Sequence, residues 1–101
     1  MDREQVMVVG KITRKNEGEK LYSVEVRCDG GNITAVKVTG EFFAYPEGLI
    51  DAMEKALVGV RLDAVPIGQA IAGAMFWLRG TLVGVRASDL VQAVLEAGRT
   101  P

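Results

Sequence analysis

Few side chains of this sequence could carry out covalent chemistry. The chain has no histidine and a single cysteine, Cys28. Without histidine there is no Ser-His or Cys-His nucleophilic pair, and no acid or base whose unperturbed pKa lies near neutrality. One cysteine without histidine also excludes the usual zinc ligand sets. Carboxylates are present, but no two are spaced in a way that indicates a paired acid and base. This inventory argues against an independent enzyme.

The thiol of Cys28 has two interpretations. A lone cysteine on a strand is most often a small buried hydrophobe. The alternative is a sulfur-accepting thiol at the tip of a turn, because "DGG" follows directly and could leave it accessible. Under that interpretation the protein would be a sulfur carrier.

The composition is typical of a soluble globular domain. With 101 residues, 49% hydrophobic and 25% charged, we expect one domain spanning residues 1–101. A net charge of −1 gives no field that would recruit nucleic acid or an anionic membrane. The longest uncharged stretch, residues 64–78, is shorter than the roughly 18 residues of a membrane span, and residues 6–9 are too few for a signal sequence. We therefore expect a cytoplasmic protein that binds neither nucleic acid nor membrane, and the unpaired thiol fits a reducing compartment.

The first 40 residues predict three antiparallel strands. In the first segment Val6, Val8 and Ile12 lie on one face, with Lys11 and Thr13 on the other. The second and third segments alternate apolar and polar side chains more strictly, and an Asp-Gly turn signal joins them. The predicted strands are residues 6–14, 21–28 and 33–40.

The rest of the chain predicts helices. Apolar residues recur at helical spacing in three segments, bounded by proline, glycine and serine at positions typical of helix ends. The predicted helices run from Pro46 to Gly59, from Asp63 to Leu78, and over residues 87–98 with Ser88 as N-cap and Gly98 as the stop; residues 80–86 form a short strand or connector. Because strands precede helices, we expect an α+β fold, an antiparallel three-stranded sheet with helices packed on one face.

The stretch "GEFFAYPEG", residues 40–48, has two adjacent phenylalanines that a simple strand would point to opposite faces. Both Phe42 and Phe43 could pack on helices of the same chain, in particular if the strand bends at Gly40. Alternatively, one ring faces the core and the other a partner.

The predicted helix over residues 64–78 is apolar nearly all round, so its own sheet or another molecule must cover it. A core helix is the simpler interpretation, and pairing with a second copy is the alternative. Phe76 and Trp77 lie off its apolar stripe, and Trp77 is the residue most expected at an interface.

Residues 31–63, "GNITAVKVTGEFFAYPEGLIDAMEKALVGVRLD", closely resemble the accessory domain of lipoate-protein ligases. The similarity extends over residues 18–98, with Lys20 and Leu21 matching a glycine-lysine motif at the start of a strand. Two departures are visible, Glu41 where the family usually has aspartate and Glu19 where it usually has glycine. The matching motif residues are Gly40, Glu41, Phe42, Phe43, Pro46, Glu54, Leu57 and Gly59.

The resemblance implies a separate, non-catalytic small subunit of a bipartite ligase. The large subunit would make lipoyl-adenylate from lipoate and ATP and transfer lipoyl to a lysine of a lipoyl domain. The partners implied are this catalytic subunit and, transiently, the lipoyl domain. No cofactor is expected on this chain alone, whereas ATP, Mg and lipoate are expected in the complex. The candidate contact residues are Lys20, Gly40, Glu41, Phe42, Phe43, Tyr45 and Trp77.

A basic cluster around the first hairpin, Lys11, Arg14, Lys15 and Lys20, is usually a solvated rim. Its functional alternative is an electrostatic contact with nucleotide phosphates or an acidic lipoyl domain. Two other functions stay open, a sulfur carrier that uses Cys28 and a self-associating binding module.

Overall fold

The computed structural model describes residues 7–99. Val6, which we predict on the apolar face of the first strand, lies outside the described residues. Three long strands come first and three helices follow. One short strand precedes the first helix and another lies between the second and third helices. The sequence pattern predicts all of these elements except the first short strand. The elements are β1 (Met7–Arg14), β2 (Tyr22–Asp29), β3 (Asn32–Gly40), β4 (Phe43–Tyr45), α1 (Leu49–Leu57), α2 (Ala64–Leu78), β5 (Thr81–Val83) and α3 (Ala87–Arg99).

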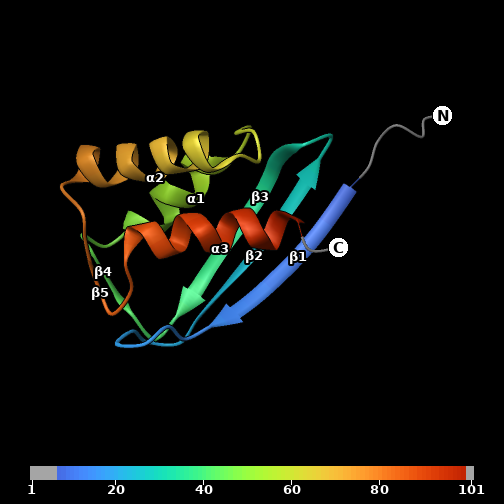
Figure 1. Ribbon diagram of the computed structural model, residues 1–101. Coiled ribbons are helices and arrows are strands. Elements are labelled where there is room, and N and C mark those ends of the chain that lie inside the picture. The colour runs from blue at the N-terminus through green and yellow to red at the C-terminus, as the bar shows by residue number, and fades with distance from the viewer. Residues whose placement is uncertain (1–6, 100–101) are drawn as a thin grey trace.

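The three long strands form one antiparallel sheet in the order β1-β2-β3. All three helices lie on one side of it (Figure 1). Because β2 is the central strand, its inward side chains are the most completely covered; Val24 and Val26 are fully buried. The predicted α+β fold with helices on one face of a three-stranded sheet is confirmed.

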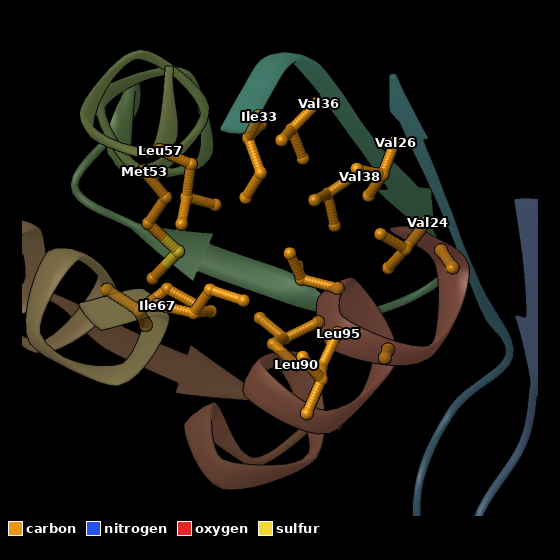
Figure 2. Close-up of a cluster of buried hydrophobic side chains, with 14 of the residues drawn as sticks. Val24, Val26, Ile33, Val36, Val38, Met53, Leu57, Ile67, Leu90 and Leu95 are labelled. Carbon is orange, nitrogen blue, oxygen red and sulfur yellow. The ribbon is translucent and has the colours of Figure 1, made fainter. Parts of the chain in front are cut away.

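The core lies between this sheet and the helices. Alternate side chains of β2 and β3 meet Met53 and Leu57 from α1, Ile67 from α2, and Leu90 and Leu95 from α3 (Figure 2). This pattern follows from sequence periodicity, which is two along the strands and about 3.6 along the helices.

The other face of the sheet is polar. Lys11 and Lys37 both pair in register with Glu25 of the central strand, so opposite charges alternate across the three strands. No helix within residues 7–99 is long and apolar enough to cross a membrane.

The free edge of β3 is covered by α1 and the segment that follows it. Ile33 donates from its backbone N–H to the carbonyl of Val60 at 2.8 Å and accepts from the N–H of Gly59 at 2.7 Å. Further along the strand, the N–H of Val38 donates to Oε2 of Glu54 on α1 at 2.7 Å. Glu54, one of the motif residues, therefore anchors α1 to the sheet by pairing an edge N–H that would otherwise be left without a protein partner.

The start of α1 differs from the prediction. Pro46 is not the first helical residue: it follows a cis peptide bond, and its carbonyl accepts from the N–H of Leu49 at 3.0 Å in the turn before the helix. Gly48 is the N-cap with φ of 94°, a left-handed conformation that glycine adopts at little cost. This backbone conformation explains a glycine that helix propensity alone disfavours.

The predicted N-cap and stop residue of the last helix are also wrong, although its predicted range, 87–98, is close to the observed Ala87–Arg99. The helix begins at Ala87, and the carbonyl of Arg86 accepts from the N–H groups of Asp89 and Leu90, so Ser88 is not the cap. Gly98 lies inside the helix and is buried. A Cβ built on it would lie 2.4 Å from the Leu62 side chain and 3.2 Å from the Cys28 sulfur. Close packing against Leu62 and Cys28, not helix termination, accounts for a glycine at this position.

We expect Glu54→Ala to lower the free energy of unfolding by about 1–3 kcal/mol, because it leaves the Val38 N–H without its partner. Lys55→Ala on the same helix is the matched control. It removes only an exposed pair with Asp51, worth about 0.5 kcal/mol or less. Urea unfolding followed by circular dichroism measures both changes, and equal losses would contradict an anchoring role for Glu54.

Candidate interaction surface

The two adjacent phenylalanines follow a sharp departure of the chain from β3 after Gly40. Gly40 pairs with Tyr22, and a Cβ on it would lie 2.7 Å from the Leu21 carbonyl oxygen and 2.8 Å from Tyr22. The next N–H, that of Glu41, donates to the same Leu21 carbonyl at 2.9 Å. Gly40 thus allows the chain to pass close over β2 before it turns into β4.

Beyond this bend, Phe42 is half-buried against the core, whereas Phe43 is 59% exposed. The fold therefore agrees with the interpretation in which only one ring faces the core; that the other ring faces a partner stays a prediction. The interpretation in which both rings pack on helices of the same chain is wrong, because Phe43 belongs to a separate short strand whose outer face carries it.

That strand, β4, pairs antiparallel with β5 as a two-stranded sheet. We call this two-stranded sheet the aromatic ribbon. Its outer face consists of Phe43, Tyr45 and Val83, which are 59%, 55% and 50% exposed. The rings of Phe43 and Tyr45 stack with their centroids 6.5 Å apart. On the inner face Ala44 and Leu82 pack against the core. The ribbon therefore has a fixed inner side and presents two aromatic rings outward.

Lys20 lies beside this ribbon. Its backbone N–H donates to the carbonyl of Gly84 at 2.7 Å. A Cβ on Gly84 would be 2.8 Å from Cγ of Lys20 and 3.4 Å from Cβ of Phe42, so these three residues meet at one point. The rest of the Lys20 side chain is in solvent. The fold thus places one cation beside Phe42 and Gly84, where the chain enters β4 and leaves β5.

Trp77 and its neighbour Phe76 project from the last turn of α2, and each is 82% exposed. The C-terminal end of α2 and the β4–β5 ribbon lie at the same end of the molecule, opposite the turn between β2 and β3 (Figure 1). Trp77 lies on α2 and not on the two strands that carry the ribbon. The structure brings Lys20, Gly40, Glu41 and Phe42 together around residues 21 and 84, and places Phe43 and Tyr45 directly after them.

A hollow of about 310 Å³ lies on the outer face of the large sheet, away from this end. None of the predicted contact residues lines it. Its walls are Val9, Glu25, Arg27, Ala35, Val36 and Lys37.

Cys28 is buried in the core, only 3% exposed, and burial raises the pKa of its thiol. A reactive thiol needs access to solvent and a depressed pKa. The sulfur-carrier interpretation is therefore not supported, and Cys28 behaves as a small hydrophobe packed beside Gly98 of α3.

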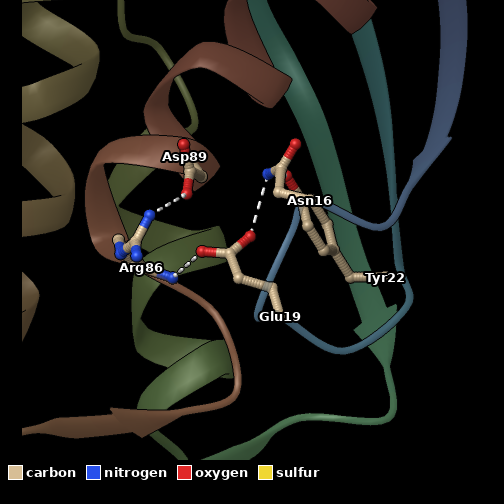
Figure 3. A network of polar contacts seen from close by, with 5 residues as sticks. All are labelled: Asn16, Glu19, Tyr22, Arg86 and Asp89. Carbon is tan, nitrogen blue, oxygen red and sulfur yellow. Dashed lines mark hydrogen bonds and ion pairs between the residues drawn. The ribbon is translucent and has the colours of Figure 1, made fainter.

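A polar network that the sequence did not reveal fastens the β1–β2 loop to the first turn of α3 (Figure 3). Glu19, only 5% exposed, accepts from the Arg86 backbone N–H at 2.9 Å and from the Asn16 side-chain amide at 2.8 Å. Asn16 also contacts the Tyr22 hydroxyl at 3.2 Å, and the Arg86 guanidinium lies 3.9 Å from Asp89. Glu19 thus replaces the expected glycine with a side chain that fixes the loop preceding Lys20.

Glu19 and Asp89 interact through their carboxyl groups, a pairing that their spacing in the sequence does not indicate. A hydrogen bond with Glu19, and then burial, raises the pKa of Asp89 above its ordinary 3.8. Burial by itself would raise the pKa of Glu19, but hydrogen bonds with Asp89, Asn16 and the Arg86 N–H outweigh it and lower that pKa below 4.5. The partners are 70 positions apart, and only the fold brings them together.

The fold is similar to that of a solved structure from an archaeal lipoylation system, a bi-partite lipoate protein ligase and its E2 lipoyl domain from Thermoplasma acidophilum. The match has a TM-score of 0.71 at 24% sequence identity and covers 89% of this chain and 96% of the other. No family model and no curated protein matches. The likeness shows a fold that is shared with a component of a lipoylation system.

The two phenylalanines should respond differently to truncation. We expect Phe42→Ala to cost about 2–3 kcal/mol of unfolding free energy, below the 3–5 typical of a fully buried phenylalanine. Phe43→Ala should cost less than about 1 kcal/mol, since it loses mainly the stacking on Tyr45. Chemical denaturation of both variants measures the difference, and equal destabilisation would show that Phe43 also belongs to the core.

The carboxyl pair predicts a particular dependence of stability on pH. The pKa of Glu19 is lowered in the folded chain. Its contribution to the free energy of unfolding therefore grows as the pH rises from that lowered pKa to 4.5, the ordinary value. Asp89, whose pKa is raised, loses stability as the pH rises from 3.8 through the raised pKa, because the unfolded chain releases the proton first. Asp89→Asn should remove the second effect, so its stability relative to wild type should increase with pH above about 4.

Urea unfolding between pH 3 and 7 tests this dependence. Asp51→Asn is the control: it removes an exposed carboxylate that pairs with Lys55, so it should not gain stability as the pH rises. A pH-independent difference between Asp89→Asn and wild type would contradict a raised pKa of Asp89 in the folded chain.

Proposed function

We propose that this chain is the non-catalytic accessory subunit of a two-part lipoate-protein ligase. It would enable a catalytic subunit to activate lipoate with ATP as lipoyl-adenylate, which that subunit then transfers to a lipoyl domain. The observation that carries the proposal is the shared fold, which extends over 96% of a chain from a bipartite lipoylation system. The proposed setting is the cytoplasm.

The side-chain inventory supports a role without chemistry of its own. The sequence has no histidine, and its one thiol is buried. Within residues 7–99, no three acidic or cysteine side chains group together as a metal site would require. We therefore assign ATP, Mg and lipoate to the complex with the catalytic subunit, not to this chain alone.

The aromatic ribbon is the surface that we assign to the catalytic subunit. Exposed aromatic rings on a supported backbone are frequent anchors of protein interfaces, because they bury a large area with little loss of side-chain entropy. Lys20, next to the ribbon, would add a charge contact to an acidic or phosphate group of the complex. Gly40, Glu41 and Phe42 contribute indirectly, since they form the bend and the packing that orient the ribbon.

Reconstitution tests the proposal. The chain is mixed with the catalytic subunit, lipoate, ATP and an apo lipoyl domain, and pyrophosphate release and lipoylation are followed separately. We expect both to depend on this chain. Lipoylation that proceeds equally well without it would refute the proposed function.

The surface assignment is tested in the same assay. A Phe43→Ser/Tyr45→Ser variant should lose most of the stimulation while keeping its melting temperature within a few degrees, because both side chains are more than half exposed. Val9→Ser is the matched control, an exposed apolar residue on the outer face of the large sheet. Full stimulation by the ribbon variant would place the catalytic subunit elsewhere on this chain.

A further inference from the structure

Helix α2 is apolar on its outward face as well as on its inward face. It contains no charged residue between Ala64 and Leu78. Ile67 and Ile71 point into the core, yet Val65 is 66% exposed and Phe76 is 82% exposed. A helix that covers its own sheet normally turns polar side chains to solvent. The outward face of α2 therefore has the composition of a helix that a second surface covers.

Opposite charges stand at the two ends of this face. Asp63 is the N-cap residue, exposed, and its side chain makes no capping hydrogen bond. Arg79 is the C-cap residue and is likewise exposed, with φ of 52°. Neither side chain has an ion-pair partner among residues 7–99. Each charge is thus free to pair with a group outside the chain.

We propose that the outward face of α2 binds the same face of a second copy of this chain, with the two helices antiparallel. Asp63 and Arg79 are each eight positions from Ile71, the middle of the helix. In an antiparallel pair centred there, the end that carries Asp63 lies at the end that carries the other copy's Arg79. A parallel pair would bring like charges together, and the helix dipoles also favour the antiparallel arrangement.

The side chains between the two charges occupy symmetric positions about Ile71, with a larger residue at one position and a smaller one at its counterpart. Val65, Gln69, Gly73 and Trp77 are spaced by four and form one ridge along α2. Val65 and Trp77 are equidistant from Ile71, as are Gln69 and Gly73. In the proposed pair the large Trp77 therefore approaches the smaller Val65, and Gln69 approaches Gly73. The surface is complementary to itself, as a two-fold interface requires.

The middle of this face permits a close approach. A Cβ built on Gly68 or Gly73 would meet nothing within 4 Å, and Ala72 between them is exposed. Small side chains let two helix axes come to the lower end of the usual 8–10 Å separation. Phe76 and Trp77 of each copy would then close over the ends of the contact.

This interface is separate from the aromatic ribbon and does not rest on the proposed function. A dimer through α2 would leave the Phe43 and Tyr45 rings of each copy on a different element and free for another partner. The alternative occupant of the α2 face is the catalytic subunit, and the test below distinguishes the two.

Analytical ultracentrifugation of the isolated chain tests the proposal, with no catalytic subunit present. We expect a dimer whose dissociation constant rises about 30-fold in Trp77→Ala, the effect of losing an interface tryptophan. Asp63→Lys and Arg79→Asp should each weaken the dimer about five-fold or more, whereas the double variant should regain near wild-type affinity because both charges are exchanged. Tyr45→Ser, on the ribbon, should dimerise as wild type does.

Circular dichroism melts confirm that each variant is folded, as exposed positions predict. A wild-type chain that stays monomeric at every concentration reached would overturn the proposal. So would a double variant that remains as weak as its single parents. If the chain is monomeric and Trp77→Ala instead weakens binding to the catalytic subunit, the α2 face belongs to that heterologous interface and the dimer is wrong.

Discussion

The whole fold depends on covering one face of a three-stranded sheet. The inward side chains of β2 and β3 are apolar and almost fully buried, and three strands do not form a stable sheet without such a cover. All three helices are used for this purpose on the same side. The opposite face stays exposed with alternating charges, of which Glu25 is the centre. Residues 7–99 form no second layer of helices, so further apolar surface on this part of the chain is covered by another molecule or remains in solvent.

The two short strands are a consequence of how α1 and α3 attach to the sheet. Gly40 lets the chain cross close to Tyr22, which directs Phe42 inward and Phe43 outward. Glu54 then ties α1 to the edge of β3, and the Glu19 network ties the β1–β2 loop to the start of α3. Between these attachments β4 and β5 are held as a ribbon whose inner residues join the core. The exposure of Phe43 and Tyr45 is thus a property of the scaffold rather than of a loose loop.

The sequence was sufficient for the long elements and insufficient for what depends on distant contacts. Strict alternation predicts β2 and β3, and helical spacing predicts the buried stripe of α2, because each signal extends over eight or more residues. A three-residue strand has no such signal, and β4 exists only because β5, far along the chain, pairs with it. Gly98 is misassigned as a helix stop for the same reason, because its packing against Leu62 and Cys28 depends on contacts between distant parts of the chain.

The candidate contact residues fall into two groups. Some are packed within the fold, and the others are exposed on its surface. Gly40 and Phe42 act through backbone approach and packing, so their side-chain identity is set by the fold. Phe43, Tyr45 and Trp77 are more than half exposed, and the packing of this chain does not require them. Exposed aromatic rings cost solubility without adding much stability, and two separate groups of them occur on a chain of 101 residues. The two groups lie on different elements of one core, the β4–β5 sheet and α2, so the two proposed interfaces can be tested independently of each other.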